Sequence, residues 1–75
     1  MNTTTLDCTG LNCPLPILKL TKTIAGMKTG ERLEMTATDP GAVKDVQAWS
    51  RQTGNVLVES LHEAGAFRFV ILKSK

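Results

Sequence analysis

The segment RLEMTATDP, residues 32–40, decides the fold, because a strand pattern changes there into a helix start. Apolar and polar residues alternate through its first part, which predicts a half-buried strand over Arg32–Thr38. Asp39 and Pro40 follow directly, and this pair is typical of an N-cap and of the first position of a helix. We therefore expect a strand that leads straight into a helix.

Downstream, the pattern predicts the rest of that helix and then a β-hairpin. The apolar residues of the helix share one arc of its surface: Ala42, Val43, Val46 and Trp49. Gly54 is placed to end the helix in the left-handed conformation. Two β-rich runs, Asn55–His62 and Ala66–Lys73, are separated by Glu63–Gly65, which indicates a hairpin with a short glycine-containing loop.

Upstream, the sequence predicts another strand and another amphipathic helix. Thr3–Cys8 is rich in threonine and reads as the strand, and Leu11–Pro16 reads as a loop that ends at a helix start. The buried face of this helix is expected to hold Ile17, Leu18, Thr21, Ile24 and Ala25. The opposite, solvent-facing side is expected to hold Leu15, Lys19 and Lys22.

The predicted element order is β-α-β-α-β-β, and two amphipathic helices need one sheet to cover. We therefore expect an α/β (α+β) two-layer sandwich, in which two helices cover a four-stranded mixed sheet. A chain of 75 residues has room for a single domain, residues 1–75.

The composition limits the possible function classes. Nine Lys and Arg against seven Asp and Glu leave a net charge of +2, too weak by itself to indicate a nucleic-acid partner. No membrane span is expected, and Met1–Thr5 lacks the features of a signal peptide, which favours a cytoplasmic protein whose two cysteines are thiols. One His and two Cys cannot supply the ligands of a structural zinc site, and so short a chain argues against a deep cofactor pocket.

The candidate reactive residue is Cys13, in the segment Cys13-Pro14-Leu15-Pro16, where the predicted loop leads into the predicted helix. A thiol at a helix N-terminus can have a lowered pKa, because the peptide N–H groups there favour an anion. The prolines restrict the backbone and would hold the sulfur at a defined place. This pattern predicts an exposed, ionised nucleophile at Cys13. The alternative is a small packed residue, since free cysteine is often buried.

The stretch Leu6-Asp7-Cys8-Thr9-Gly10-Leu11-Asn12-Cys13-Pro14-Leu15-Pro16 resembles the N-terminal signature of the TusA/SirA-like family of small sulfur-carrier proteins. In that signature Asp7, Gly10, Leu11, Pro14 and Pro16 form the supporting motif around Cys13. The resemblance extends along nearly the whole chain and implies the same two-layer sandwich. It implies a sulfurtransferase that acts as a persulfide relay, needs no cofactor or metal, and carries sulfur on Cys13.

The resemblance also implies partner proteins. The donor would be a cysteine desulfurase or a rhodanese, and the acceptor a protein of the DsrE/TusD type. The sulfur would go to tRNA 2-thiouridine synthesis, molybdenum cofactor maturation or sulfur oxidation. Leu15 beside the sulfur, with Lys19 and Lys22, is a candidate docking surface, although the lysines could simply be solvated. A monomer suits a protein that shuttles between partners.

Cys8 stands where many relatives carry a small residue without sulfur. It is either a second, resolving thiol or a small residue packed beneath the loop. A thiol–disulfide or redox-sensing module that uses Cys8 and Cys13 is therefore the main alternative function. A regulatory adaptor and an RNA-binding module are further alternatives. The RNA-binding one lacks aromatic residues for a stacking surface, because Phe67 and Phe69 are expected to face the core. His62 is expected to be a solvated residue at a strand end.

Overall fold

The computed structural model describes residues 3–74, so the ends of the predicted domain, 1–75, lie outside it. The first two residues, part of the stretch where the sequence predicts no signal peptide, are among those not described. Six elements follow one another along the chain: β1 (Thr3–Cys8), α1 (Leu15–Ala25), β2 (Arg32–Ala37), α2 (Ala42–Thr53), β3 (Val56–Glu63) and β4 (Ala66–Leu72). This order is the predicted one.

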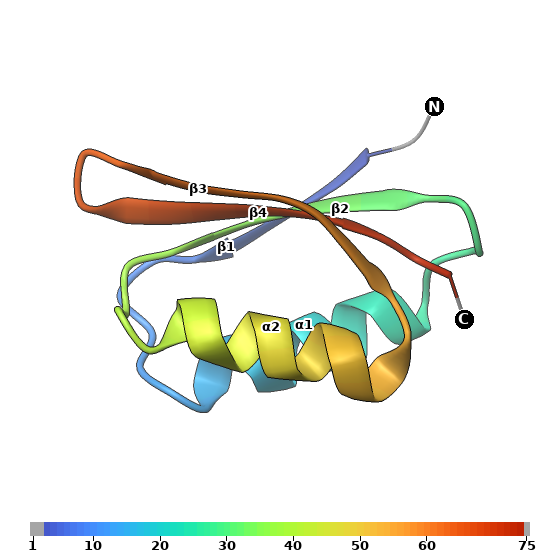
Figure 1. Ribbon diagram of the computed structural model, residues 1–75, viewed down its shortest axis with the longest axis horizontal. Helices are drawn as coiled ribbons and strands as arrows, with labels where there is room; N and C mark the ends of the chain where they lie inside the picture. Colours follow the sequence, from blue (N-terminus) through green and yellow to red (C-terminus); the bar gives the residue numbers. More distant parts are fainter. Residues whose placement is uncertain (1–2, 75) are drawn as a thin grey trace.

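The four strands form one mixed sheet in the order β1-β2-β4-β3. β1 and β2 are parallel, whereas β4 is antiparallel to both β2 and β3. Both helices lie side by side on the same face of the sheet (Figure 1). The predicted two-layer sandwich is therefore confirmed. No helix in residues 3–74 is long and apolar enough to cross a membrane.

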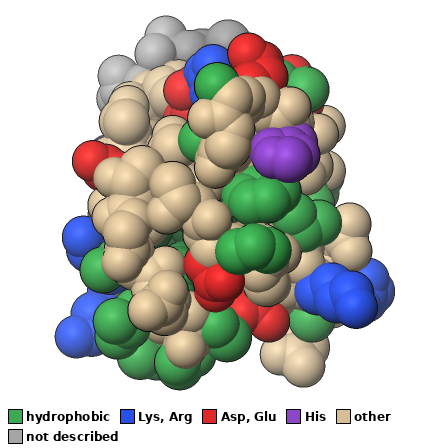
Figure 2. Space-filling view, turned by 90° about the vertical axis from the view of Figure 1, so that its left-hand side faces the viewer, with side chains coloured by type: hydrophobic (Ala, Val, Ile, Leu, Met, Phe, Trp, Pro, Cys, Tyr) green, Lys and Arg blue, Asp and Glu red, His purple; other side chains and the backbone are tan. Residues whose placement is uncertain are grey.

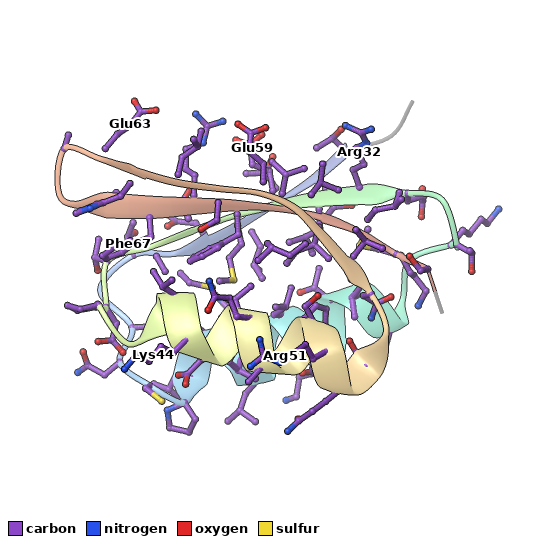
Figure 3. The ribbon with its side chains drawn as sticks, viewed as in Figure 1. Arg32, Lys44, Arg51, Glu59, Glu63 and Phe67 are labelled. Carbon is purple, nitrogen blue, oxygen red and sulfur yellow. The ribbon has the colours of Figure 1, made fainter. Side chains whose placement is uncertain are left out.

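The core lies between the sheet and the helices. The strand alternation predicted for β2 is confirmed, because Leu33, Met35 and Ala37 are all buried. Phe69 is buried beside them, while Phe67 is only half-buried at the end of the core. Within residues 3–74 no helix or strand covers the other face of the sheet, and Glu59 and Glu63 of β3 point away from the helices there (Figure 3).

The predicted buried face of α1 is wrong in part. The helix buries Pro16, Leu20 and Ile24, whereas Leu18 is 53% exposed. Residues four positions apart lie in one row along a helix. The row formed by Pro16, Leu20 and Ile24 faces the sheet. Apolar residues occupy both sides of the row, so periodicity alone left the helix rotation ambiguous, and packing against the sheet decided it.

The predicted start of α2 is also wrong, by two residues. Asp39 is not the N-cap and Pro40 is not the first helical residue, because the helix begins at Ala42 with Gly41 as its N-cap. The Asp39 carboxylate instead accepts a 3.3 Å hydrogen bond from the Gly41 N–H within the preceding turn. At the other end the prediction is confirmed, since Gly54 has a φ of 80°.

The hairpin loop is shorter than expected. Glu63 pairs with Ala66, which leaves only Ala64 and Gly65 as the loop. Their φ angles are 49° and 79°, and positive φ at both central residues is the geometry of a type I′ turn. The turn type matches the twist of the two strands, and it is adopted even though the first loop residue is Ala.

Candidate functional site

Cys13 lies in the loop between β1 and α1, directly before the helix, and its side chain is exposed. Because β1 and β2 are parallel, the loops that follow them leave the sheet at the same end, and the β3–β4 turn lies there too (Figure 1). The predicted exposure of this cysteine is confirmed. Leu15 next to it is 49% exposed, and Lys19 and Lys22 are also exposed, as predicted.

Two hydrogen bonds join the Cys13 loop to the loop before α2. The N–H of Gly10 donates to the Thr38 hydroxyl at 2.9 Å. The N–H of Cys13 donates to the Asp39 carboxylate at 2.8 Å. The loop that carries the sulfur is therefore attached to the neighbouring loop through two side chains, one of which, Asp39, the sequence had suggested as a helix cap.

The residues of the supporting motif shape the start of the same loop. Asp7 accepts hydrogen bonds from the Thr9 N–H at 3.0 Å and from the Thr9 hydroxyl at 2.6 Å, and these bonds lower the pKa of Asp7. Gly10 has a φ of 79°, a region that residues with a Cβ rarely adopt. Leu11 packs against the core and anchors the middle of the loop. Of Asp7, Gly10 and Leu11, only Gly10 has a backbone conformation that requires a particular residue type.

The two prolines occupy the helix start. Pro14 is the N-cap of α1, the Cys13–Pro14 peptide bond is cis, and Pro16 is a buried residue of the first turn. Pro16 therefore contributes to the core as well as to the helix start. The helix itself begins with Leu15, directly after the N-cap.

The electrostatic prediction for Cys13 is wrong in direction. The pKa of the Cys13 thiol is raised above its usual value, and the largest cause is a hydrogen bond between the thiol and the Asp45 side chain. Partial loss of hydration and the negative charges of Asp45 and Asp39 act in the same direction. These surroundings therefore favour the protonated thiol over the thiolate.

The helix start does little to oppose these carboxylates. Pro14 and Pro16 have no N–H to offer to an anion. The N–H of Leu15 donates to the Asn12 carbonyl at 2.8 Å, and the N–H of Cys13 is already bonded to Asp39. The two prolines that suggested an ordered nucleophile thus also remove the donors that would have stabilised a thiolate.

A shallow groove of about 200 Å³ lies beside the sulfur, between α1 and α2. Its lining residues come from both helices and from the loop: Cys13, Pro14, Ile17, Asp45, Ala48, Trp49 and Gln52. The helices are held together there by a 3.2 Å hydrogen bond from the Trp49 Nε1–H to the Thr21 hydroxyl. Figure 2 shows this end of the molecule, where acidic side chains lie among hydrophobic ones and basic side chains lie at the sides.

Sequence reasoning missed Asp45 as a member of the site. Its only local signal is its position in the first turn of α2, where acidic residues are common because of the helix dipole. Nothing in the sequence connects that turn with Cys13. The two residues meet because α1 and α2 lie side by side on the sheet.

Cys8 is not part of the exposed site. It is fully buried in the core, both cysteines are free thiols, and burial raises the pKa of the Cys8 thiol. The interpretation of Cys8 as a small packed residue is thus confirmed. His62 is exposed and stacks on Phe67 with ring centroids 4.3 Å apart. Residues 3–74 contain no cluster of three or more His, Cys, Asp or Glu side chains able to hold a metal ion.

The fold and the site define a small two-layer α+β protein that presents one cysteine at the start of its first helix. The chain belongs to the TusA family, because the family model described as Sulfurtransferase TusA matches residues 4–73. This membership supports a sulfur-carrier function, and a carrier of this kind interacts with sulfur-donor and sulfur-acceptor proteins.

Individual relatives agree with this assignment. The sulfur carrier protein TusA of Allochromatium vinosum is 56% identical over 92% of this chain and 91% of its own length. A putative sulfur carrier protein of Neisseria meningitidis is 49% identical over 95% of this chain and 96% of its own. A SirA-like protein from Desulfitobacterium hafniense has the same fold, with a TM-score of 0.83 at 20% identity, and the match covers 99% of this chain and 100% of that one.

Proposed function

We propose that Cys13 accepts sulfane sulfur as a persulfide and passes it to an acceptor protein. The observation that carries this proposal is the contrast between the two thiols, since Cys13 is exposed beside a groove and Cys8 is buried. Sulfur transfer between proteins requires a sulfur atom that another protein's sulfur can reach. Of the two thiols, Cys13 alone meets that requirement.

The reaction has two balanced steps. In the first, Cys13 loses its proton and its sulfur attacks the outer sulfur of a donor persulfide, R–S–SH. The donor S–S bond breaks, and the donor leaves as a thiolate that takes up the proton, which gives Cys13–S–SH and R–SH. In the second, an acceptor thiolate attacks the terminal sulfur and Cys13 leaves as a thiolate. No external oxidant or reductant is consumed.

The protein acts in this scheme as a relay and not as a stand-alone catalyst. The donor class is a cysteine desulfurase or a rhodanese, and the acceptor class is a DsrE/TusD-type protein. The sulfur is destined for tRNA thiolation, molybdenum cofactor maturation or sulfur oxidation. We propose a single-domain monomer whose partners dock around Leu15, near Lys19 and Lys22, where an apolar side chain is exposed beside the sulfur. Membership of the sulfurtransferase TusA family supports the proposed exchange with donor and acceptor proteins, and the exposure of Leu15 supports the proposed docking site.

Intact-mass spectrometry after incubation with a desulfurase plus cysteine, or with a rhodanese plus thiosulfate, tests the proposal. Wild-type protein should gain the mass of one or more sulfur atoms, and a reductant should remove them. Cys13→Ser should gain none, whereas Cys8→Ala should load like the wild type. Sulfur on the Cys13→Ser variant would contradict the assignment and move the role to Cys8.

A further inference from the structure

Cys13 and Asp45 line the same groove between the two helices, and a hydrogen bond between their side chains is the largest cause of the raised pKa of the thiol. An ionised carboxylate can only accept hydrogen bonds, so this contact exists only while the thiol keeps its proton. Removing the proton would replace the hydrogen bond with two adjacent negative charges.

The surroundings offer no compensating cation in the described part of the chain. The charged groups that act on the Cys13 sulfur are Asp45 from α2 and Asp39 from the loop before it, and both are acidic. Lys19 on α1 acts on Asp7 and Cys8 instead. Lys44 and Arg51 are exposed and extend from α2 into solvent (Figure 3).

We propose that Asp45 gates the carrier. It keeps the Cys13 sulfur protonated in the free protein, and a lysine or arginine of the docked donor or acceptor releases this restraint by pairing with the carboxylate. The proposal rests on the proposed sulfur-carrier role of Cys13, and it names the chemistry that a partner must bring to the groove.

The same carboxylate acts on the loaded form. The terminal sulfur of Cys13–S–SH would carry its negative charge near Asp45, and Cys13 itself must leave as a thiolate when the sulfur is handed on. Both anions are disfavoured beside an unpaired carboxylate. A cationic side chain of the partner therefore assists loading and unloading alike, and the carrier stays unreactive between partners.

The first test is the pH dependence of Cys13 alkylation by iodoacetamide, followed by peptide mass mapping. Asp45→Asn should move the midpoint to lower pH and raise the rate at pH 7 about three- to thirtyfold, because each unit of pKa changes the thiolate fraction about tenfold. Asp45→Glu keeps the charge and should keep the high midpoint. Lys44→Gln changes a neighbouring charge that points into solvent and should not lower the midpoint.

The second test uses methanethiosulfonate reagents, whose thiosulfonate sulfur a thiolate attacks with loss of methanesulfinate. Wild-type protein should react faster with the aminoethyl reagent, which is cationic, than with the sulfonatoethyl reagent, which is anionic. Asp45→Asn should lower the ratio of the rate with the cationic reagent to the rate with the anionic reagent about threefold or more. A merely structural role for Asp45 would change both rates equally and leave the ratio intact.

The outcomes separate the gate from the carrier function. If wild-type protein loads sulfur on Cys13 but Asp45→Asn shows the wild-type midpoint and reagent ratio, the gate is wrong and the carrier function stands. If the midpoint and the ratio both move as expected, the gate is supported. If Cys13→Ser loads like the wild type, the carrier role of Cys13 fails, and with it the purpose assigned to the gate.

Discussion

The backbone N–H of Cys13 donates a 2.8 Å hydrogen bond to the carboxylate of Asp39. The acceptor belongs to the loop that precedes the other helix, so this bond fixes the sulfur-bearing loop relative to α2. The Asp39 carboxylate also accepts a hydrogen bond from the N–H of Gly41. One side chain thus orders two loops at the site and, through its charge, opposes ionisation of the thiol it positions.

Asp39→Ala should therefore destabilise the protein by about 1–2 kcal/mol, because two backbone donors lose a charged acceptor. Asp39→Asn retains one acceptor oxygen and should cost less. Urea denaturation monitored by Trp49 fluorescence measures both changes. An alanine variant as stable as the wild type would show that the bond does not hold the loop.

The pH dependence of Cys13 reactivity follows from its raised pKa. The folded state holds this proton more tightly than an unfolded chain does. The thiol should therefore stay unreactive through the pH range in which an ordinary cysteine ionises, and alkylation should accelerate only above it. The stability that this proton contributes is present at lower pH and is lost as the pH rises through the folded-state pKa. A midpoint at or below that of free cysteine would contradict this expectation.

Added salt should lower that midpoint. The carboxylates act on an exposed sulfur, and mobile ions screen charges in contact with solvent. The shift of the midpoint is measured from alkylation rates of the wild-type protein. These rates are recorded over a range of pH, once in low salt and once in about 1 M salt. A midpoint that does not move with salt would indicate that local hydrogen bonding alone sets the pKa.

The observed rotation of α1 predicts opposite outcomes for two leucines. Leu20→Ala should destabilise the protein by about 2–5 kcal/mol, since it removes a fully buried side chain from the core. Leu18→Ala is the matched control and should change stability by no more than about 0.5 kcal/mol. Equal losses of unfolding free energy in denaturation curves would mean that the helix is rotated differently.

The hairpin loop predicts one stabilising change and one destabilising change. Ala64 has a positive φ that favours Asn or Gly, so Ala64→Gly should stabilise the protein by about 0.5–1 kcal/mol. Gly65→Ala should destabilise it by about 1–2 kcal/mol, because a Cβ is strained in the left-handed region. Thermal unfolding measures both. The turn geometry would be contradicted if the two signs were reversed.

The sequence by itself determined the elements and their order. Alternation predicted β2, the apolar arc predicted α2, and Gly54 predicted its end. The position of Cys13 at a helix start also followed from its neighbours, whereas its exposure was one of two alternatives that the structure decided. Each of these features depends on residues within a few positions of one another, where backbone periodicity and turn chemistry act.

Only the tertiary structure decided the rotation of α1 and the direction in which the pKa of Cys13 is shifted. Leu20 is buried and Leu18 exposed because of the way the helix packs on the sheet. The pKa of Cys13 depends on Asp45, a residue that the fold brings to the groove from another helix. Electrostatic interactions act through space, so a local sequence pattern could indicate where the thiol lies but could not indicate its protonation.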